Sequence, residues 1–71
     1  MHDENLFDAL ATLTGLELYV LAGVDVDGMT ERAIGEELTA SRGVHFDRDR
    51  VHRIRLTAHS KLRRYLLEDA A

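Results

Sequence analysis

The chain has 71 residues, no cysteine and a formal net charge of −4. This length suits one domain, residues 1–71, with a small core that supplies only about 3–5 kcal/mol of net stability. The absence of cysteine excludes disulfides and thiolate zinc sites. No apolar stretch approaches the roughly 20 residues of a membrane span, and no signal pattern is present. We therefore expect a cytoplasmic protein without a membrane partner.

The first 22 residues predict two helices. Residues 3–13 show helical spacing of their large apolar residues, namely Leu6, Phe7, Leu10 and Leu13. Thr14 and Glu17 then have the spacing of a capping box, in which each side chain satisfies an open backbone N–H of the other residue. This box starts a second helix through about Ala22, which we expect to bury Leu18, Val20 and Leu21 in part.

A break and a third helix follow. Residues 23–28 contain two glycines and two aspartates and predict a turn. Thr30 is the expected N-cap of a helix over residues 31–42, and Gly43 is expected to end it. The residues expected on its buried side are Ala33, Ile34, Leu38 and Ala40.

The last predicted helix is long, reaches Leu66 and has two distinct sides. Asp47 is its expected N-cap, and Phe46 is placed to pack on Val51 or Ile54 as a hydrophobic staple. Its apolar stripe consists of Val51, Ile54, Ala58, Leu62 and Tyr65. Its adjoining basic stripe consists of Arg48, His52, Arg55, His59 and Arg63. The sequence therefore predicts an all-α, four-helix domain.

Charge is distributed unevenly along the chain. Residues 1–40 hold nine acidic residues and one arginine, whereas residues 41–71 hold eight lysines and arginines and four acidic residues. A helix that is buried on one side and basic on another is typical of an element that contacts nucleic acid. The alternative interpretation is that the arginines are solvated or pair with the acidic N-terminal helices.

Other chemistries find little support in the sequence. His52 and His59 share a helix but lie seven residues apart, too far for one metal ion. The segment 25–28 resembles part of a calcium loop but lacks its first and twelfth ligands. No serine has an orienting carboxylate and a glycine elbow. We expect no catalytic site, no metal and no cofactor.

Taken together, the last three helices resemble region 4 of the sigma factors of bacterial RNA polymerase. In the first helix of the motif, Ile34, Gly35 and Leu38 match the family pattern. In the second helix the matching residues are Asp47, Arg48, Asp49, Arg50, Val51, Ile54, Ala58, Lys61, Leu62, Arg63 and Arg64. The resemblance covers residues 6–66. It implies a C-terminal helix-turn-helix over about residues 30–66 with a long recognition helix.

The resemblance also implies a DNA-binding surface. Arg48, Asp49 and Arg53 fall where family members contact base edges, with each good contact worth about 1–3 kcal/mol of discrimination. Phosphate or positioning contacts are expected from the remaining members of the predicted site, which are Thr30, Arg50, His52 and Arg55.

Two departures from the family pattern affect this expectation. Residues 39–45 replace the usual tight turn with about six extra residues. We expect them to lengthen the first helix of the motif by two turns; the alternative is a short inserted loop. Arg53 stands where the family usually has Gln, and His52 where it has Arg, so the target sequence need not be the usual promoter element. The sigma regions that read the other promoter element have no counterpart in this chain, so we expect a stand-alone domain.

These observations predict a small transcriptional regulator that binds double-stranded DNA as a homodimer. Dimerisation is expected through the acidic N-terminal helices or the Leu66–Leu67 end. The alternative prediction is a sigma-like interaction module that binds RNA polymerase, or another transcription protein, without touching DNA. In that case the acidic helices carry the contact.

Overall fold

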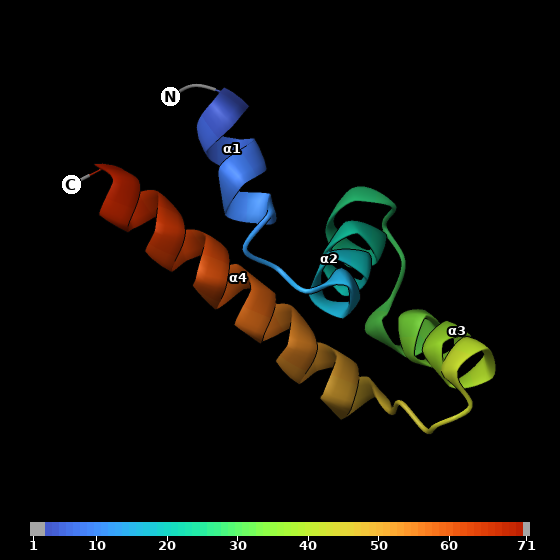
Figure 1. Ribbon diagram of the computed structural model, residues 1–71. Coiled ribbons are helices and arrows are strands. Elements are labelled where there is room, and N and C mark those ends of the chain that lie inside the picture. The colour runs from blue at the N-terminus through green and yellow to red at the C-terminus, as the bar shows by residue number, and fades with distance from the viewer. Residues whose placement is uncertain (1–2, 71) are drawn as a thin grey trace.

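The computed structural model describes residues 3–70, with side chains for residues 6–67, and these residues form helices and no strand (Figure 1). Four α-helices and one π-helical segment follow in order: α1 (Asp3–Leu10), α2 (Gly15–Leu21), η1 (Ala22–Val26), α3 (Glu31–Arg42) and α4 (Arg48–Ala70). The predicted all-α class with four helices is therefore confirmed.

The predicted helix ends are confirmed where a cap defines them. Thr14 and Glu17 form both hydrogen bonds of the capping box that starts α2. The Thr30 hydroxyl accepts the Ala33 N–H at 3.0 Å and caps α3. Asp47 accepts the Arg50 N–H at 2.7 Å at the start of α4. Gly43, at φ 74°, ends α3 in the left-handed conformation that glycine adopts most easily.

Helix α1 is shorter than predicted and packs differently. It ends at Leu10 because the backbone tightens there: the Thr12 N–H and hydroxyl both donate to the Ala9 carbonyl. Such local side-chain bonds compete with the hydrogen bonds of a helix. Leu6 and Phe7 remain 47% and 69% exposed, whereas Ala9 is fully buried. The expected inward face of large residues is therefore wrong at these two positions.

Two other residues expected to be buried are exposed. Ala40 follows the buried Leu38 by two positions, and two helical steps place it on nearly the opposite side of α3. Leu18 of α2 is also exposed, because this helix turns Val20 and Leu21 toward the rest of the protein. The predictions that Leu18 and Ala40 are buried are therefore wrong.

The turn predicted over residues 23–28 is also corrected. Ala22–Val26 continues α2 as a π-helix, which closes where the Asp27 N–H donates to the Ala22 carbonyl at 3.0 Å. Gly23 serves packing, because a Cβ there would lie 2.3 Å from Ile34 Cδ1. Only Gly28, at φ 72°, has the backbone conformation of a glycine turn.

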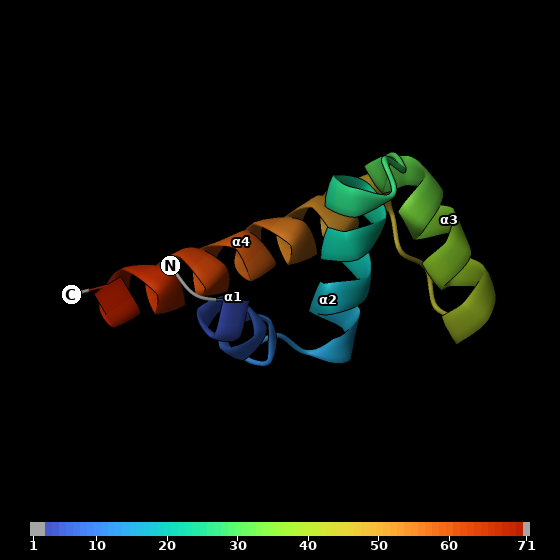
Figure 2. The ribbon, with the colours of Figure 1, turned by 90° about the horizontal axis from the view of Figure 1, so that it is seen from above.

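Helix α4 is the longest helix of the protein, and α1, α2 and α3 all contact it. It has 23 residues and runs along most of the 40 Å length of the protein, whose other two dimensions are 18 and 17 Å. Figures 1 and 2 agree that α1 lies beside its C-terminal half, whereas α2 and α3 lie near its N-terminal half. Within residues 3–70, no helix is both long and apolar enough to cross a membrane.

The largest part of the core lies where α2, α3 and α4 meet. Its buried side chains are Val20, Ile34, Leu38, Phe46 and Val51. Phe46 and Val51 belong to this cluster, as the predicted hydrophobic staple requires. Gly35 brings α3 close to the start of α4, because a Cβ there would lie 2.7 Å from the Phe46 carbonyl oxygen. This close approach positions the α4 N-terminus.

Candidate nucleic-acid interface

Three of the predicted contact residues in the first two turns of α4 are exposed and have no side-chain partner among the described residues. Arg48, Asp49 and Arg53 are all exposed, and none forms a side-chain hydrogen bond or ion pair with the described residues. Farther along α4, Arg63 and Arg64 are exposed and unpaired in the same sense. We call Arg48, Arg53, Arg63 and Arg64 the open arginines, because their charges are available to a partner.

Arg50 and Thr30, also predicted to contact DNA, have structural roles. The Arg50 guanidinium lies 4.1 Å from the centre of the Phe46 ring and donates to the His45 carbonyl at 3.2 Å. A cation over an aromatic face is weakly attractive. The Thr30 hydroxyl oxygen already accepts the Ala33 N–H, although the residue is exposed. Both residues therefore hold local structure next to the predicted interface.

A surface groove lies over the junction of α3, the connection that follows it and the start of α4. It is lined by Arg32, Glu36, Thr39, Ala40, His45, Phe46, Asp47, Arg48 and Asp49. Arg32 was not predicted as a contact residue, yet it lines the same groove as Arg48. The acidic members of the lining make this groove mixed in charge, so the positive charge of Arg48 is not part of a broad basic patch.

The extra residues 39–45 are accommodated without separating the two helices. Helix α3 continues past Leu38 to Arg42, about one turn and not the two expected from the extra residues, and a short connection over residues 43–47 follows. The Thr39 hydroxyl donates to the Gly35 carbonyl at 2.8 Å and accepts the Phe46 N–H at 2.9 Å. One side chain thus ties the connection back to α3 just before α4 begins.

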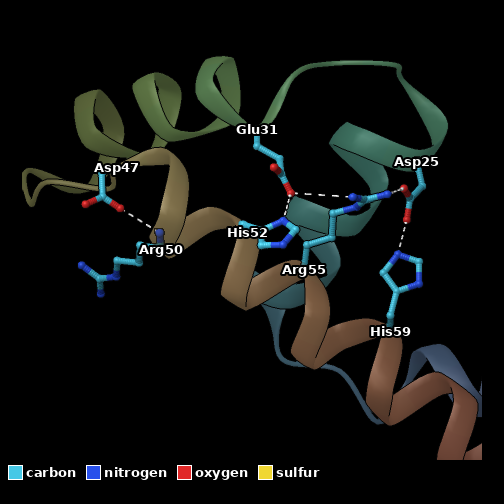
Figure 3. A network of polar contacts seen from close by, with 7 residues as sticks. All are labelled: Asp25, Glu31, Asp47, Arg50, His52, Arg55 and His59. Atoms are coloured by element: carbon cyan, nitrogen blue, oxygen red, sulfur yellow. Dashed lines mark hydrogen bonds and ion pairs between the residues drawn. The ribbon is translucent and has the colours of Figure 1, made fainter.

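The other basic edge of α4 is occupied by acidic residues (Figure 3). Arg55 donates to Asp25 Oδ1 through Nη2 at 2.7 Å, and His59 Nε2 lies 2.8 Å from Asp25 Oδ2. His52 Nδ1 lies 2.7 Å from Glu31 Oε2, and Arg55 Nη1 is 3.7 Å from the same oxygen. We call this set of Asp25, Glu31, His52, Arg55 and His59 the acid–base ladder.

The π-helical segment explains how Asp25 reaches α4. Its wide turn carries the chain from α2 toward α3 and presents the Asp25 carboxylate to both Arg55 and His59 (Figure 3). Glu31 enters the ladder from the first turn of α3, directly after the Thr30 cap. Three successive elements are thereby joined by one polar network.

The contact between Asp25 and Arg55 shifts the pKa values of both groups. Partial burial raises the pKa of Asp25, but the hydrogen bond and charge of Arg55, followed by those of His59, outweigh it, and the pKa lies below 3.8. The Asp25 hydrogen bond in turn raises the pKa of the Arg55 guanidinium above its usual value. Both shifts favour the charged pair.

Two further polar contacts connect the helices. Lys61 Nζ donates to Glu17 Oε1 at 2.7 Å, and this hydrogen bond, with that of the Thr14 N–H, lowers the pKa of the buried Glu17. The Tyr19 hydroxyl of α2 donates to the Glu37 carboxylate of α3, which raises the pKa of Tyr19. Lys61 therefore belongs to the internal network and not to the open arginines.

The candidate site thus divides the seven predicted residues into two groups. Arg48, Asp49 and Arg53 are free to meet a partner, whereas Thr30, Arg50, His52 and Arg55 already form contacts within the chain. For His52 and Arg55 the sequence did contain a signal: the basic stripe of α4 and the acidic excess of residues 1–40. It did not specify which acids would be adjacent.

The described side chains offer no group of three or more histidine, aspartate or glutamate residues that could hold a metal ion. Comparison with known protein families, with curated proteins and with solved structures finds no match for this chain.

Proposed function

We propose that this protein is a helix-turn-helix regulator that binds double-stranded DNA through the N-terminal end of α4. The observation that carries the proposal is the exposure of Arg48, Asp49 and Arg53 in the first two turns, without partners among the described residues. In helix-turn-helix proteins, this end of the second helix lies in the major groove. Guanine and cytosine edges are the matching partners for arginine and carboxylate side chains.

The packing of α3 against α4 supports the same proposal. Gly35 allows close approach, and Thr39 ties the connection, so that the two helices of the motif are held together at the start of α4. A recognition helix requires such support, since a contact displaced by a fraction of an ångström loses much of its value. The sigma-like sequence pattern agrees with this geometry.

The test is fluorescence anisotropy with a random-sequence duplex, titrated from about 50 to 200 mM salt. We expect binding whose logarithmic affinity falls linearly with log salt. The variant Arg48→Ala/Arg53→Ala should bind the duplex more weakly than the unaltered protein, because it removes both arginines from the proposed contact end of α4. The matched control is Arg63→Ala/Arg64→Ala, which removes the same charge from the far end of the same helix.

Two outcomes would contradict the proposal. One is the absence of binding at the lowest salt concentration. The other is an equal loss of affinity in both double variants, because binding would then depend on total charge and not on the start of α4.

We also propose that two copies act together on DNA. A single module of this kind buries only about 600–1,000 Å² on DNA and binds weakly alone. The exposed Phe7 of α1 and Leu67 of α4 provide apolar area for contact between copies. Multi-angle light scattering with and without duplex should give a mass of two chains on DNA; a single chain under both conditions would contradict this.

A second candidate function has an observation in its favour. The acid–base ladder neutralises much of the basic edge of α4, as expected of a module that binds a protein such as RNA polymerase through its acidic helices. Glu36 is the better test position, because it is exposed and unpaired among the described residues, whereas Glu37 holds Tyr19. Glu36→Lys should weaken polymerase binding in a pull-down if this function holds, and leave it unchanged otherwise.

A further inference from the structure

We propose that Asp25 and Glu31 act as internal counter-charges that withhold His52, Arg55 and His59 from DNA phosphates and thereby limit non-specific binding. This inference rests on the proposed DNA-binding function and adds a regulatory role for two acidic residues outside the predicted site. The acids occupy the positions that phosphate oxygens would otherwise take.

The geometry supports competition with phosphate. Arg55 donates to Asp25 Oδ1 at 2.7 Å, a distance typical of a charge-assisted hydrogen bond. The His52 and His59 nitrogens lie 2.7 and 2.8 Å from the carboxylates of Glu31 and Asp25, respectively. Each cationic or titratable group thus already has an anionic acceptor, the role that a DNA phosphate would play.

The ladder is nevertheless accessible to solvent. The side chains of His52, Arg55 and His59 are 48%, 30% and 43% exposed. They occupy one edge of α4, beginning one turn after Arg48. Without the acids, this edge would extend the positive surface of Arg48 and Arg53 along the helix.

The charge balance of this edge determines whether DNA affinity should rise or fall when the two acids are replaced. With neutral imidazoles, Arg55 contributes one positive charge, and Asp25 and Glu31 contribute two negative charges, so the edge repels a phosphate backbone. Replacing both acids with neutral amides reverses the sign of the edge. Because phosphate binding releases counterions, each additional phosphate that the protein neutralises makes the salt dependence steeper.

The experiment compares two double variants of the full chain. Asp25→Asn/Glu31→Gln removes both ladder charges but keeps the side-chain shape and one acceptor oxygen at each position. Asp8→Asn/Asp27→Asn is the matched control, since it removes the same formal charge from exposed positions that lie outside the groove beside Arg48 and have no side-chain partners among the described residues. Circular dichroism melts establish that each variant is folded before binding is measured.

We expect the ladder variant to bind a random-sequence duplex about tenfold more tightly than the control at about 50 mM salt. Its salt slope should be steeper by about 0.9 for each additional phosphate that it neutralises. Equal affinities and slopes for the two variants, with DNA binding retained, would overturn the withholding role alone. Absence of binding by every protein, including the unaltered chain, would instead contradict the proposed function itself.

A single-residue comparison keeps the proposal testable if the ladder variant does not fold. Arg55→Ala should lower DNA affinity less than Arg53→Ala does, because Arg55 is already paired with Asp25 and Glu31 and makes no phosphate contact in the proposal. Arg53→Ala removes an open arginine from the same helix and should lower affinity several-fold. An equal loss in both variants would overturn the proposal.

Discussion

Two sets of basic residues lie along the same helix and differ in their surroundings. The open arginines project from α4 without a partner among residues 6–67, whereas His52, Arg55 and His59 face Asp25 and Glu31 across a few ångströms. Their sequence spacing alone does not separate them. What separates them is the path of the chain between α2 and α3, which brings acidic residues to one edge of α4 only.

This comparison shows why charge in a sequence is not the same as charge available to a partner. The segment 41–71 is strongly basic, but part of its charge is paired with acidic residues nearer the N-terminus, as in Arg55–Asp25 and Lys61–Glu17. A salt bridge that is partly exposed contributes little to stability, typically less than about 1 kcal/mol. Under the proposed function, its larger effect is on the electrostatic surface that a DNA phosphate would meet.

The largest expected effect comes from breaking the packing on which the difference between the two sets depends. In Gly35→Ala the new Cβ would meet the Phe46 carbonyl oxygen at 2.7 Å, so α3 must move away from the start of α4. Overpacking of this kind costs about 1–3 kcal/mol. Urea unfolding should show this loss of stability. DNA affinity should also change, because Glu31 moves with α3 and its contacts with His52 and Arg55 are altered.

Gly15→Ala is the matched control, because a Cβ added at this position would have no atom within 4 Å. It should leave the free energy of unfolding unchanged or raise it slightly. Equal stability of the two variants would show that the close approach at Gly35 does not constrain α3.

A smaller effect on stability is expected when the first turn of α3, which carries Glu31 of the acid–base ladder, is destabilised. Thr30→Ala removes the hydrogen bond to the Ala33 N–H and should destabilise the first turn of α3, where Glu31 lies. Loss of such a cap costs about 1 kcal/mol. Chemical denaturation in the absence of DNA measures this cost, and Thr30→Ser, which retains the hydroxyl, should recover most of it.

The smallest expected effect is a dependence of stability on acid. The pKa values of Asp25 and Glu17 lie below their ordinary values of 3.8 and 4.5. The stabilisation from these carboxylates is therefore complete above those values and is lost as pH falls through the lowered pKa of each folded-state group. Thermal melts from about pH 6 to about pH 2, at intervals of about one pH unit, would follow this loss.

Asp25→Asn should reduce this acid dependence, because the amide does not titrate. Asp27→Asn is the control, and it should retain the full dependence of the unaltered protein. A steep acid transition that persists in Asp25→Asn would show that the ladder has no measurable share in the effect.

Features that depend on neighbouring residues could be predicted from the sequence. The caps at Thr14, Thr30 and Asp47 and the glycine end of α3 at Gly43 are local, because each is decided within about one helical turn. The apolar stripe of α4 was predicted from its helical spacing, and its members Val51 and Ala58 are fully buried.

Features that depend on distant residues could not be predicted in the same way. The contacts of Asp25 with Arg55 and His59 join residues 30 and 34 positions apart. The role of Gly23 depends on the approach of Ile34, and a glycine in the sequence indicates a turn as readily as a close approach. Phe7 is exposed because α1 turns Ala9, and not Phe7, toward the rest of the protein. Helical spacing alone does not decide which of these residues is buried.

The most direct test of the division into two sets is a nuclear magnetic resonance titration of isotope-labelled protein with a short duplex. We expect the Nε–Hε signals of Arg48 and Arg53 to shift on binding, whereas the signal of Arg55 should stay near its position in the free protein. Shifts confined to α1 and α2, or a shift of Arg55 as large as that of Arg53, would contradict the division.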